Sequence, residues 1–248
     1  MKKQIIKAKI FVNIIKLCYN LSMKNLFEKF KISVSVNNLE KFEIYYNLLI
    51  EYNQKFNLTA ITEREEVIVK HFIDSVLGVD KIVGNKLIDI GSGGGFPAIP
   101  LKILRDDVML TMVEATGKKC EFLKTVVDKL QLRNVTVLNG RAEDLAKNPL
   151  YREKFDACTA RAVARLNSLC EYCMPFVKKD GYFVAYKGEA EQEIIEAKNA
   201  IKVLGGELEC VNDFDLLGAK RQIVCIKKTK NTPALYPRGN GKERKKPL

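Results

Sequence analysis

The sequence predicts an α/β fold in which a largely parallel sheet carries helices on both faces and follows a helical N-terminal extension. From residue 86 onward, short apolar runs alternate with segments of helical periodicity, which is typical of repeated βα units. A glycine cluster directly follows the first apolar run, and the residues before 83 show helical spacing only. We therefore divide the 248 residues into a helical arm and cap (1–82), a core (83–230) and a basic C-terminal tail (231–248).

The N-terminal extension begins with a loosely amphipathic arm over residues 1–22, to which the sequence assigns no role. Apolar and aromatic side chains recur at helical spacing within residues 38–55, which predicts a helix, and a turn at 57–59 follows it. Thr62 and Glu65 have the spacing of a capping box. We therefore expect a second helix to open there and to run to about Leu77.

The core is expected to hold five parallel strands and a closing antiparallel hairpin at one edge of the sheet. Helices are expected from Pro97 onward, through the apolar face that includes Leu123 and Leu130, and over the charged amphipathic segment 189–204. The expected strands cover residues 86–90, 108–113, 135–138, 155–159, 182–186, 207–214 and 221–227.

Positive charge is concentrated at the two ends of the chain. The net charge is +12, and residues 1–31 and 227–248 each carry +7, which leaves −2 for residues 32–226. Basic ends on a nearly neutral body favour a polyanionic partner such as nucleic acid. The alternative is a general bias of the composition toward lysine, because 32 of the 42 basic residues are Lys.

Cysteine usage predicts a reducing compartment. The seven cysteines are odd in number and irregularly spaced, and the chain has one His, so neither a disulfide framework nor a zinc site is expected. The Cys170-x-x-Cys173 pair is interpreted as part of a buried apolar helix. No apolar run approaches the roughly 18 residues of a membrane span, and no secretory signal is evident. We expect a cytoplasmic protein without a metal.

The glycine cluster Gly91-Ser92-Gly93-Gly94-Gly95-Phe96 is placed between the first strand and the next helix. Such a turn needs positive φ and close backbone approach, and it places a ligand over the carboxyl end of the strand. A dinucleotide site requires GxGxxG, but Phe96 occupies the position of the last glycine. The loop therefore favours S-adenosylmethionine over NAD, and a purely structural glycine turn remains an alternative.

Glu114 ends the second strand and supports a nucleoside ligand. A carboxylate at this position can accept hydrogen bonds from both ribose hydroxyls. The segment 140–144 after the third strand would lie beside the adenine, although the same residues could simply cap a helix. Glu114 could likewise be only an acidic residue at a helix start.

Strand four leads into Thr159-Ala160-Arg161-Ala162-Val163-Ala164-Arg165. This segment has neither the Asn/Asp-Pro-Pro-aromatic motif of amine methylation nor a Pro-Cys nucleophile. Arg161 and Arg165 would share a helical face if the helix has begun, and they could contact guanine O6 or a phosphate. Guanine N7 has a free lone pair, so we nominate no general base and expect catalysis by positioning. Surface salt bridging is the alternative role of these arginines.

Over about residues 25–248, the sequence resembles the bacterial small-subunit ribosomal RNA guanine-N7 methyltransferases, called RsmG or GidB. Its most specific match is Asp-Ile-Gly-Ser-Gly-Gly-Gly-Phe-Pro at 89–97, and Ala98 and Gly239 depart from the family pattern. The other matching segments are 52–53, 56–59, 71–72, 74–75, 99–101, 118–119, 122–123, 161–164, 187–188, 236–238, 241 and 247–248.

The resemblance implies a Rossmann-like class I methyltransferase that uses S-adenosylmethionine to methylate N7 of a guanosine in 16S rRNA, as free rRNA or in a small-subunit particle. The family's cofactor positions then correspond to Gly91, Phe96, Ala142, Glu143 and Arg161, to which the loop and ribose arguments add Gly93 and Glu114. For His71 we expect a hydrogen bond to Asp74 across one helical turn, with an RNA-facing role as the alternative.

Three rival functions remain open at this stage. The protein could methylate another RNA, a small molecule or a protein, it could be an NAD-dependent oxidoreductase, or it could bind RNA without catalysis. We expect a monomer without membrane association.

Overall fold

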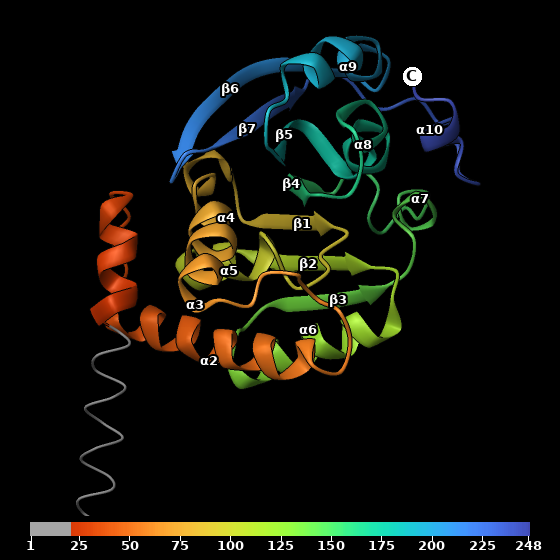
Figure 1. The fold of residues 1–248 in the computed structure, drawn as a ribbon. Helices are drawn as coiled ribbons and strands as arrows, with labels where there is room; N and C mark the ends of the chain where they lie inside the picture. Colours follow the sequence, from red (N-terminus) through yellow and green to blue (C-terminus); the bar gives the residue numbers. More distant parts are fainter. Residues whose placement is uncertain (1–20) are drawn as a thin grey trace, which may run out of the picture.

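The computed structural model describes residues 21–248 and contains one seven-stranded sheet in the order β3-β2-β1-β4-β5-β7-β6 (Figure 1). The first five strands pair in parallel, and β7 pairs antiparallel with both β5 and β6. The predicted fold class and the edge hairpin are thus confirmed. The strands are β1 (Lys86–Ile90), β2 (Met109–Glu114), β3 (Val135–Asn139), β4 (Phe155–Arg161), β5 (Val177–Lys187), β6 (Gly206–Leu216) and β7 (Ala219–Lys228).

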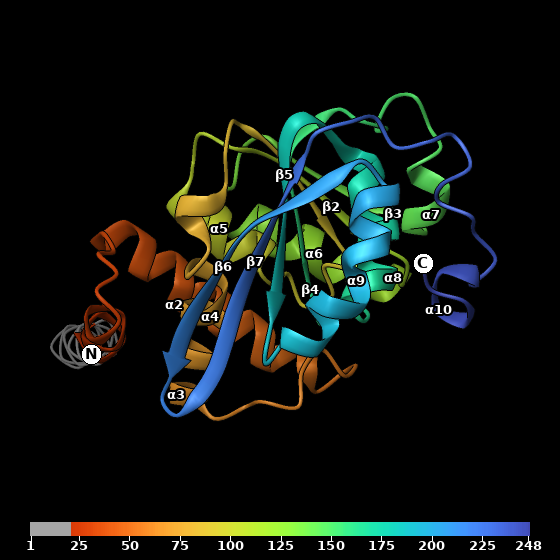
Figure 2. The same cartoon turned by 90° about the horizontal axis from the view of Figure 1, so that it is seen from above.

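Helices cover both faces of the sheet and form two hydrophobic cores, as side chains alternate along each strand. On β1, Leu87 belongs to the first core and Ile88 to the second. The first core includes α2 (Val36–Asn53), α5 (Ala98–Leu104) and α6 (Gly117–Lys129). The second includes α8 (Leu166–Cys173) and α9 (Glu191–Val203), with α7 (Ala142–Leu145) at its margin (Figure 2).

The N-terminal helices belong to the first core. Residues 21–29 are helical, and the rings of Phe42, Tyr45, Phe72 and Phe96 pack against one another with centroid separations of 5.0–6.1 Å. These contacts join the helices directly to the loop after β1, which carries Phe96. The predicted arm 1–22 lies outside the described residues except for its last two, and the division of the chain at residue 82 stays a prediction.

The capping box expected at Thr62 and Glu65 is wrong. Glu63 is the N-cap of α3 (Arg64–Val67), and no side chain caps that helix. The helix then widens into the π-helical segment η1 (Ile68–Ile73) before α4 (Asp74–Val76). The local S/T-x-x-E pattern therefore does not mark the start of this helix.

Strand β5 begins five residues earlier than predicted. The polar residues Lys178, Lys179 and Asp180 are exposed and do not show the apolar pattern from which a strand is predicted. The strand nevertheless starts at Val177, which pairs with Phe155 across a bulge.

Of the short elements, η2 (Val79–Lys81) lies before β1 and η3 (Met174–Phe176) leads into β5. Among the helices of residues 21–248, none combines the length and apolar character that a membrane crossing demands.

The basic tail folds back onto the second core rather than extending away from it. Arg238 donates to the fully buried carboxylate of Glu171 through Nε at 2.9 Å and Nη2 at 2.7 Å. The short helix α10 (Lys242–Lys245) contacts α8, and Ser168 Oγ donates to the Glu243 carbonyl at 2.7 Å. Figures 1 and 2 show α10 beside α8, with α7 nearby.

The docking of the tail predicts a specific stability effect. Replacing Arg238 by Met should lower the free energy of unfolding by about 3–5 kcal/mol, because it leaves the buried Glu171 carboxylate without its cation. The double replacement Arg238→Met with Glu171→Gln should recover part of this loss, since no buried charge then remains. Urea unfolding of both variants measures the effect, and a loss below 1 kcal/mol in the single variant would contradict it.

Candidate functional site

The loop after β1 is shaped by two glycines that no other residue could replace without strain. Gly91 has φ +71°, and a Cβ atom there would meet Val163 Cγ2 at 2.6 Å. Gly95 has φ +94°, and a Cβ there would meet the Tyr45 hydroxyl at 2.5 Å. The Tyr45 hydroxyl donates to the Gly94 carbonyl, so the N-terminal helix α2 holds the backbone of this loop in place. The predicted turn is thus held between α2 and the segment that follows β4.

Glu114 lies where the sequence placed it, at the end of β2 beside the loop. Its side chain is 7% exposed, and its two oxygens accept from Gly93 N at 2.9 Å and Thr116 N at 2.8 Å. Each carboxylate oxygen can accept two hydrogen bonds, so acceptor capacity remains after these contacts. Glu114 therefore fixes the loop and can also receive ligand hydroxyl groups.

A cavity of about 520 Å³ opens over this loop. That size falls within the range of small-molecule and cofactor sites. It brings together four of the predicted cofactor residues, namely Gly91, Glu114, Ala142 and Glu143. We call this cavity the crevice; its remaining lining residues are Ile90, Val113, Ala115, Gly140, Arg141, Asp144, Val163, Tyr172, Asn240, Gly241 and Arg244.

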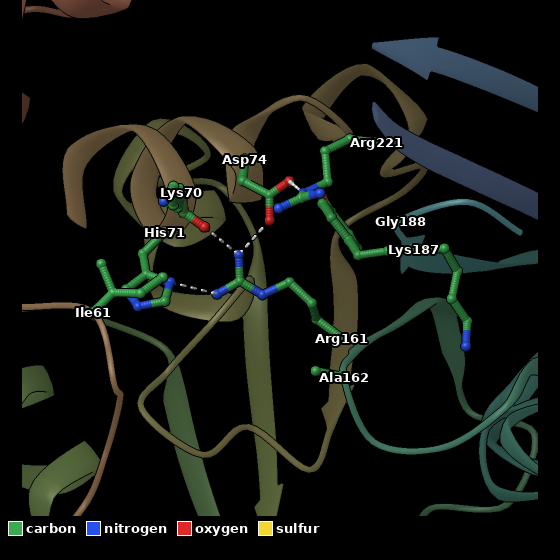
Figure 3. A pocket seen from close by; sticks show the side chains of 10 residues that line it. Ile61, Lys70, His71, Asp74, Arg161, Ala162, Lys187, Gly188 and Arg221 are labelled. Atoms are coloured by element: carbon green, nitrogen blue, oxygen red, sulfur yellow. Dashed lines mark hydrogen bonds and ion pairs between the residues drawn. The ribbon is translucent and has the colours of Figure 1, made fainter. Parts of the chain in front are cut away.

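Phe96 and Arg161 do not line the crevice. They contact each other, with the Arg161 guanidinium 5.0 Å from the Phe96 ring centroid. Arg161 Nη1 donates to Asp74 Oδ2 at 2.6 Å and to the Lys70 carbonyl at 3.3 Å (Figure 3). On the other side of Asp74, Arg221 Nε lies 3.3 Å from Oδ1. Asp74 is only 5% exposed, so one buried carboxylate holds two guanidinium groups.

A second cavity of about 440 Å³, which we call the cationic pocket, is lined by Arg161, Asp74, Lys70 and Arg221 but not by Phe96. Four of its lining residues are cations, Lys70, Arg161, Lys187 and Arg221, against the single carboxylate of Asp74. Ala162 lines the cationic pocket, and its neighbour Val163 lines the crevice. Consecutive residues of the loop that leaves β4 therefore contribute to both cavities.

The hydrogen bond predicted from His71 to Asp74 is wrong. His71 instead stacks on Phe96 at 4.6 Å between ring centroids, and its Nε2 lies 2.7 Å from Thr59 Oγ1. Its Nδ1 lies 3.4 Å from Arg161 Nη2, and because a guanidinium only donates, Nδ1 must accept. The imidazole is therefore neutral, with the proton on Nε2. Burial, followed by the nearby Arg161 charge, lowers the pKa of His71 to about 4.

Arg165 lies apart from this site, contrary to the expected helical pairing with Arg161. Helix α8 begins only at Leu166, and Ala162 has φ +57°, so the intervening residues form a loop. The Arg165 side chain is 59% exposed and pairs with Glu196 at 2.5 Å. Its role is the surface ion pair that was the alternative interpretation.

Beneath the loop, Asp89 joins two strands. It is fully buried, and its Oδ1 accepts from Thr159 Oγ1 of β4 at 2.7 Å, while Oδ2 has no hydrogen-bond partner within residues 21–248. Burial raises the pKa of Asp89 to about 7. The cysteines Cys158, Cys170 and Cys173 are buried nearby as predicted, and no cluster suited to a metal ion occurs in the described part of the chain.

Several residues of the two cavities were not predicted as a site. Arg221 comes from β7, Tyr172 from α8, and the segment 240–244 from the tail. Their only sequence signals were the basic tail and the match at 236–241, neither of which indicates contact with the crevice.

Comparison with known proteins supports the expected family. Residues 38–224 match the family model described as rRNA small subunit methyltransferase G. A Ribosomal RNA small subunit methyltransferase G of Desulfitobacterium hafniense is 48% identical over 89% of this chain and 94% of its own length. The protein of the same name from Bacillus subtilis is 46% identical over 88% of this chain and 93% of its own length.

Solved structures support the fold. The TYW2 protein of P. horikoshii, solved in complex with MeSAdo, superimposes with a TM-score of 0.51, covering 63% of this chain and 61% of that protein at 14% sequence identity. This likeness supports the predicted Rossmann-like fold of the sheet.

The environment of His71 predicts how stability depends on pH. Because its pKa is about 4 in the folded protein and about 6.5 when unfolded, the unfolded chain binds a proton between these values that the native protein excludes. The stability advantage of wild type over His71→Asn should therefore shrink by about 3 kcal/mol from pH 7 to pH 4. Denaturant unfolding across this range measures it, and a constant difference would contradict the neutral imidazole.

Proposed function

We propose, since the chain belongs to the rRNA small subunit methyltransferase G family, that it transfers a methyl group from S-adenosylmethionine to N7 of one guanosine in 16S ribosomal RNA. The observation that carries this proposal is that two consecutive residues, Ala162 and Val163, line two different cavities. One offers a ribose-binding carboxylate beside a glycine loop, and the other presents cations to an anionic substrate.

The crevice suits S-adenosylmethionine, which supplies a methyl group on a positively charged sulfonium when bound. Gly91 lines the crevice and has no Cβ, so that Val163 packs directly over it, and Glu114 retains acceptor capacity for ribose hydroxyls. Gly93, whose amide Glu114 holds, would form the loop backbone beside the cofactor. Ala142 and Glu143, at the start of α7, would contact the adenine. Phe96 and Arg161 would not touch the cofactor through the crevice. They would instead support the loop from the side of the cationic pocket, where they contact each other.

The cationic pocket suits a guanine with its phosphates. The described groups there offer no free general base, because Asp74 is engaged by two arginines and His71 donates to Thr59 while accepting from Arg161. N7 needs no deprotonation, so positioning is sufficient. Arg161, already oriented by Asp74, would donate to guanine O6 or to a phosphate.

Ribosomal RNA is a suitable partner for the basic ends of this chain. On the tail, Lys242, Lys245 and Lys246 are exposed and can contact phosphates. We further propose that the protein acts as a monomer in the cytoplasm, on free 16S rRNA or on the small-subunit particle.

The decisive experiment supplies tritiated S-adenosylmethionine to the purified protein with small-subunit particles or bare 16S rRNA from cells lacking it. N7-methylguanosine is then mapped by borohydride and aniline cleavage of the RNA. Label at one guanosine of 16S rRNA supports the proposal. Label in another RNA, in protein or in small molecules contradicts the substrate, and RNA binding without transfer contradicts the activity. A melting temperature raised by NAD but not by S-adenosylmethionine would contradict the cofactor.

Glu114→Ala should weaken binding of S-adenosylhomocysteine by about 1–3 kcal/mol, because it removes a charge-assisted acceptor for the ribose. Isothermal calorimetry measures the affinity, and Glu121→Ala on the exposed face of α6 serves as a control with the same loss of charge. Equal affinities for both variants would contradict a ribose contact, provided that both unfold at the temperature of wild type.

Arg161→Lys should lower the rate of methyl transfer by about 100-fold, because a lysine cannot reproduce the fork that is oriented by Asp74. The matched control is Arg165→Lys, four residues away and paired with Glu196 at the surface, which should retain the wild-type rate. Single-turnover transfer to small-subunit particles measures both. If the two variants lose activity equally, the role assigned to Arg161 is wrong.

A further inference from the structure

The C-terminal tail forms one wall of the crevice. Asn240, Gly241 and Arg244 all line it, across from residues that follow β2 and β3. Arg244 Nη2 donates to the Val163 carbonyl at 3.0 Å, and Val163 is the residue packed over Gly91. The tail therefore reaches the loop that separates the crevice from the cationic pocket.

Three contacts hold this wall in place. Arg238 is fixed on the buried Glu171 carboxylate, Ser168 Oγ donates to the Glu243 carbonyl, and the fully buried Glu243 side chain accepts from the Gly239 amide. The Oε2 atom of Glu243 has no hydrogen-bond partner in residues 21–248. Burying a carboxylate costs free energy unless it is hydrogen-bonded. Here the Glu243 carboxylate accepts from the Gly239 amide and so closes the turn that positions Asn240 and Gly241.

Arg244 and Tyr172 both line the crevice, and the groups acting on the Tyr172 hydroxyl include Glu243, Glu143 and Arg244. Glu143 belongs to the segment after β3, which the proposed function places beside the adenine. The Arg244 guanidinium thus contacts the Val163 carbonyl and also acts on Tyr172, whose other charged neighbours include Glu143.

We propose that the segment 240–244 is part of the methyl-donor site and that Arg244 is a binding residue for the adenosine moiety. A planar guanidinium can stack on the face of a purine or donate to its ring nitrogens. Arg244 lines the crevice, whereas Lys242 and Lys245 of the same helix do not, so we expect different roles for them. This inference rests on the proposed function, because it takes the crevice to be the S-adenosylmethionine site.

The test compares Arg244→Ala with Lys245→Ala in the full chain. Lys245 follows directly in the same helix, carries the same charge, is exposed and does not line the crevice. Calorimetry is performed with S-adenosylhomocysteine and with methylthioadenosine, which lacks the amino-acid moiety. Arg244→Ala should weaken both ligands by a similar factor of about five to ten, the scale of a cation–π contact in a partly desolvated site. Lys245→Ala should change neither affinity.

A second variant that ends at Gly239 keeps the Arg238–Glu171 pair and should weaken both ligands at least as much as Arg244→Ala. Three results would overturn the inference: Arg244→Ala equal to Lys245→Ala, an effect on S-adenosylhomocysteine without one on methylthioadenosine, or weaker rRNA binding with unchanged cofactor affinity. If the wild-type protein itself binds neither ligand, the proposed cofactor fails together with this inference. If the wild-type protein binds both ligands and the variants give one of these three results, this inference is overturned and the proposed cofactor stands.

Discussion

The buried ion pair between Asp74 and Arg161 is the interaction on which the geometry of the site depends. It joins a helix of the N-terminal extension to the end of β4, and Arg221 extends the connection to β7. Breaking such a pair is expensive because the remaining charge stays buried. The pair fixes the guanidinium that lines the cationic pocket and lies over the Phe96 ring. The N-terminal helices are therefore a working part of the site, and the sheet alone would leave Arg161 without its partner.

The loop after β1 is constrained from both sides for the same reason. Tyr45 holds the Gly94 carbonyl from the first core, and Glu114 holds the Gly93 amide at the end of β2. Val163 packs over Gly91 from above. A loop with this many glycines would lose much conformational entropy on binding a ligand, and these contacts remove most of that freedom in advance. Preorganisation of the enzyme is thus distributed over three segments that are distant in sequence.

Local patterns predicted the sheet well, since each strand has its own apolar run and the glycine loop its own turn residues. They also placed Glu114 beside that loop, because the carboxyl ends of parallel strands meet at one edge. The errors concern contacts that no local pattern encodes. Arg161 meets Asp74 across 87 residues, so the expected partner of His71 was already engaged elsewhere. Arg165 was expected on the helical face of Arg161, but the helix begins one residue after it. The tail was expected to bind a polyanion because it is basic, yet its Arg238 is paired with Glu171 within the fold.

The packing of the last residues has a practical consequence for handling the protein. Leu248 is half-buried against the second core, a few residues beyond the wall that Asn240, Gly241 and Arg244 contribute. An affinity tag or fluorescent fusion appended after Leu248 begins beside this packing and beside the contact between α10 and α8. Loss of ligand affinity in such a fusion would then reflect the label rather than the enzyme, so reagents that report on binding should be attached to exposed side chains far from this corner, such as those on the outer face of α6.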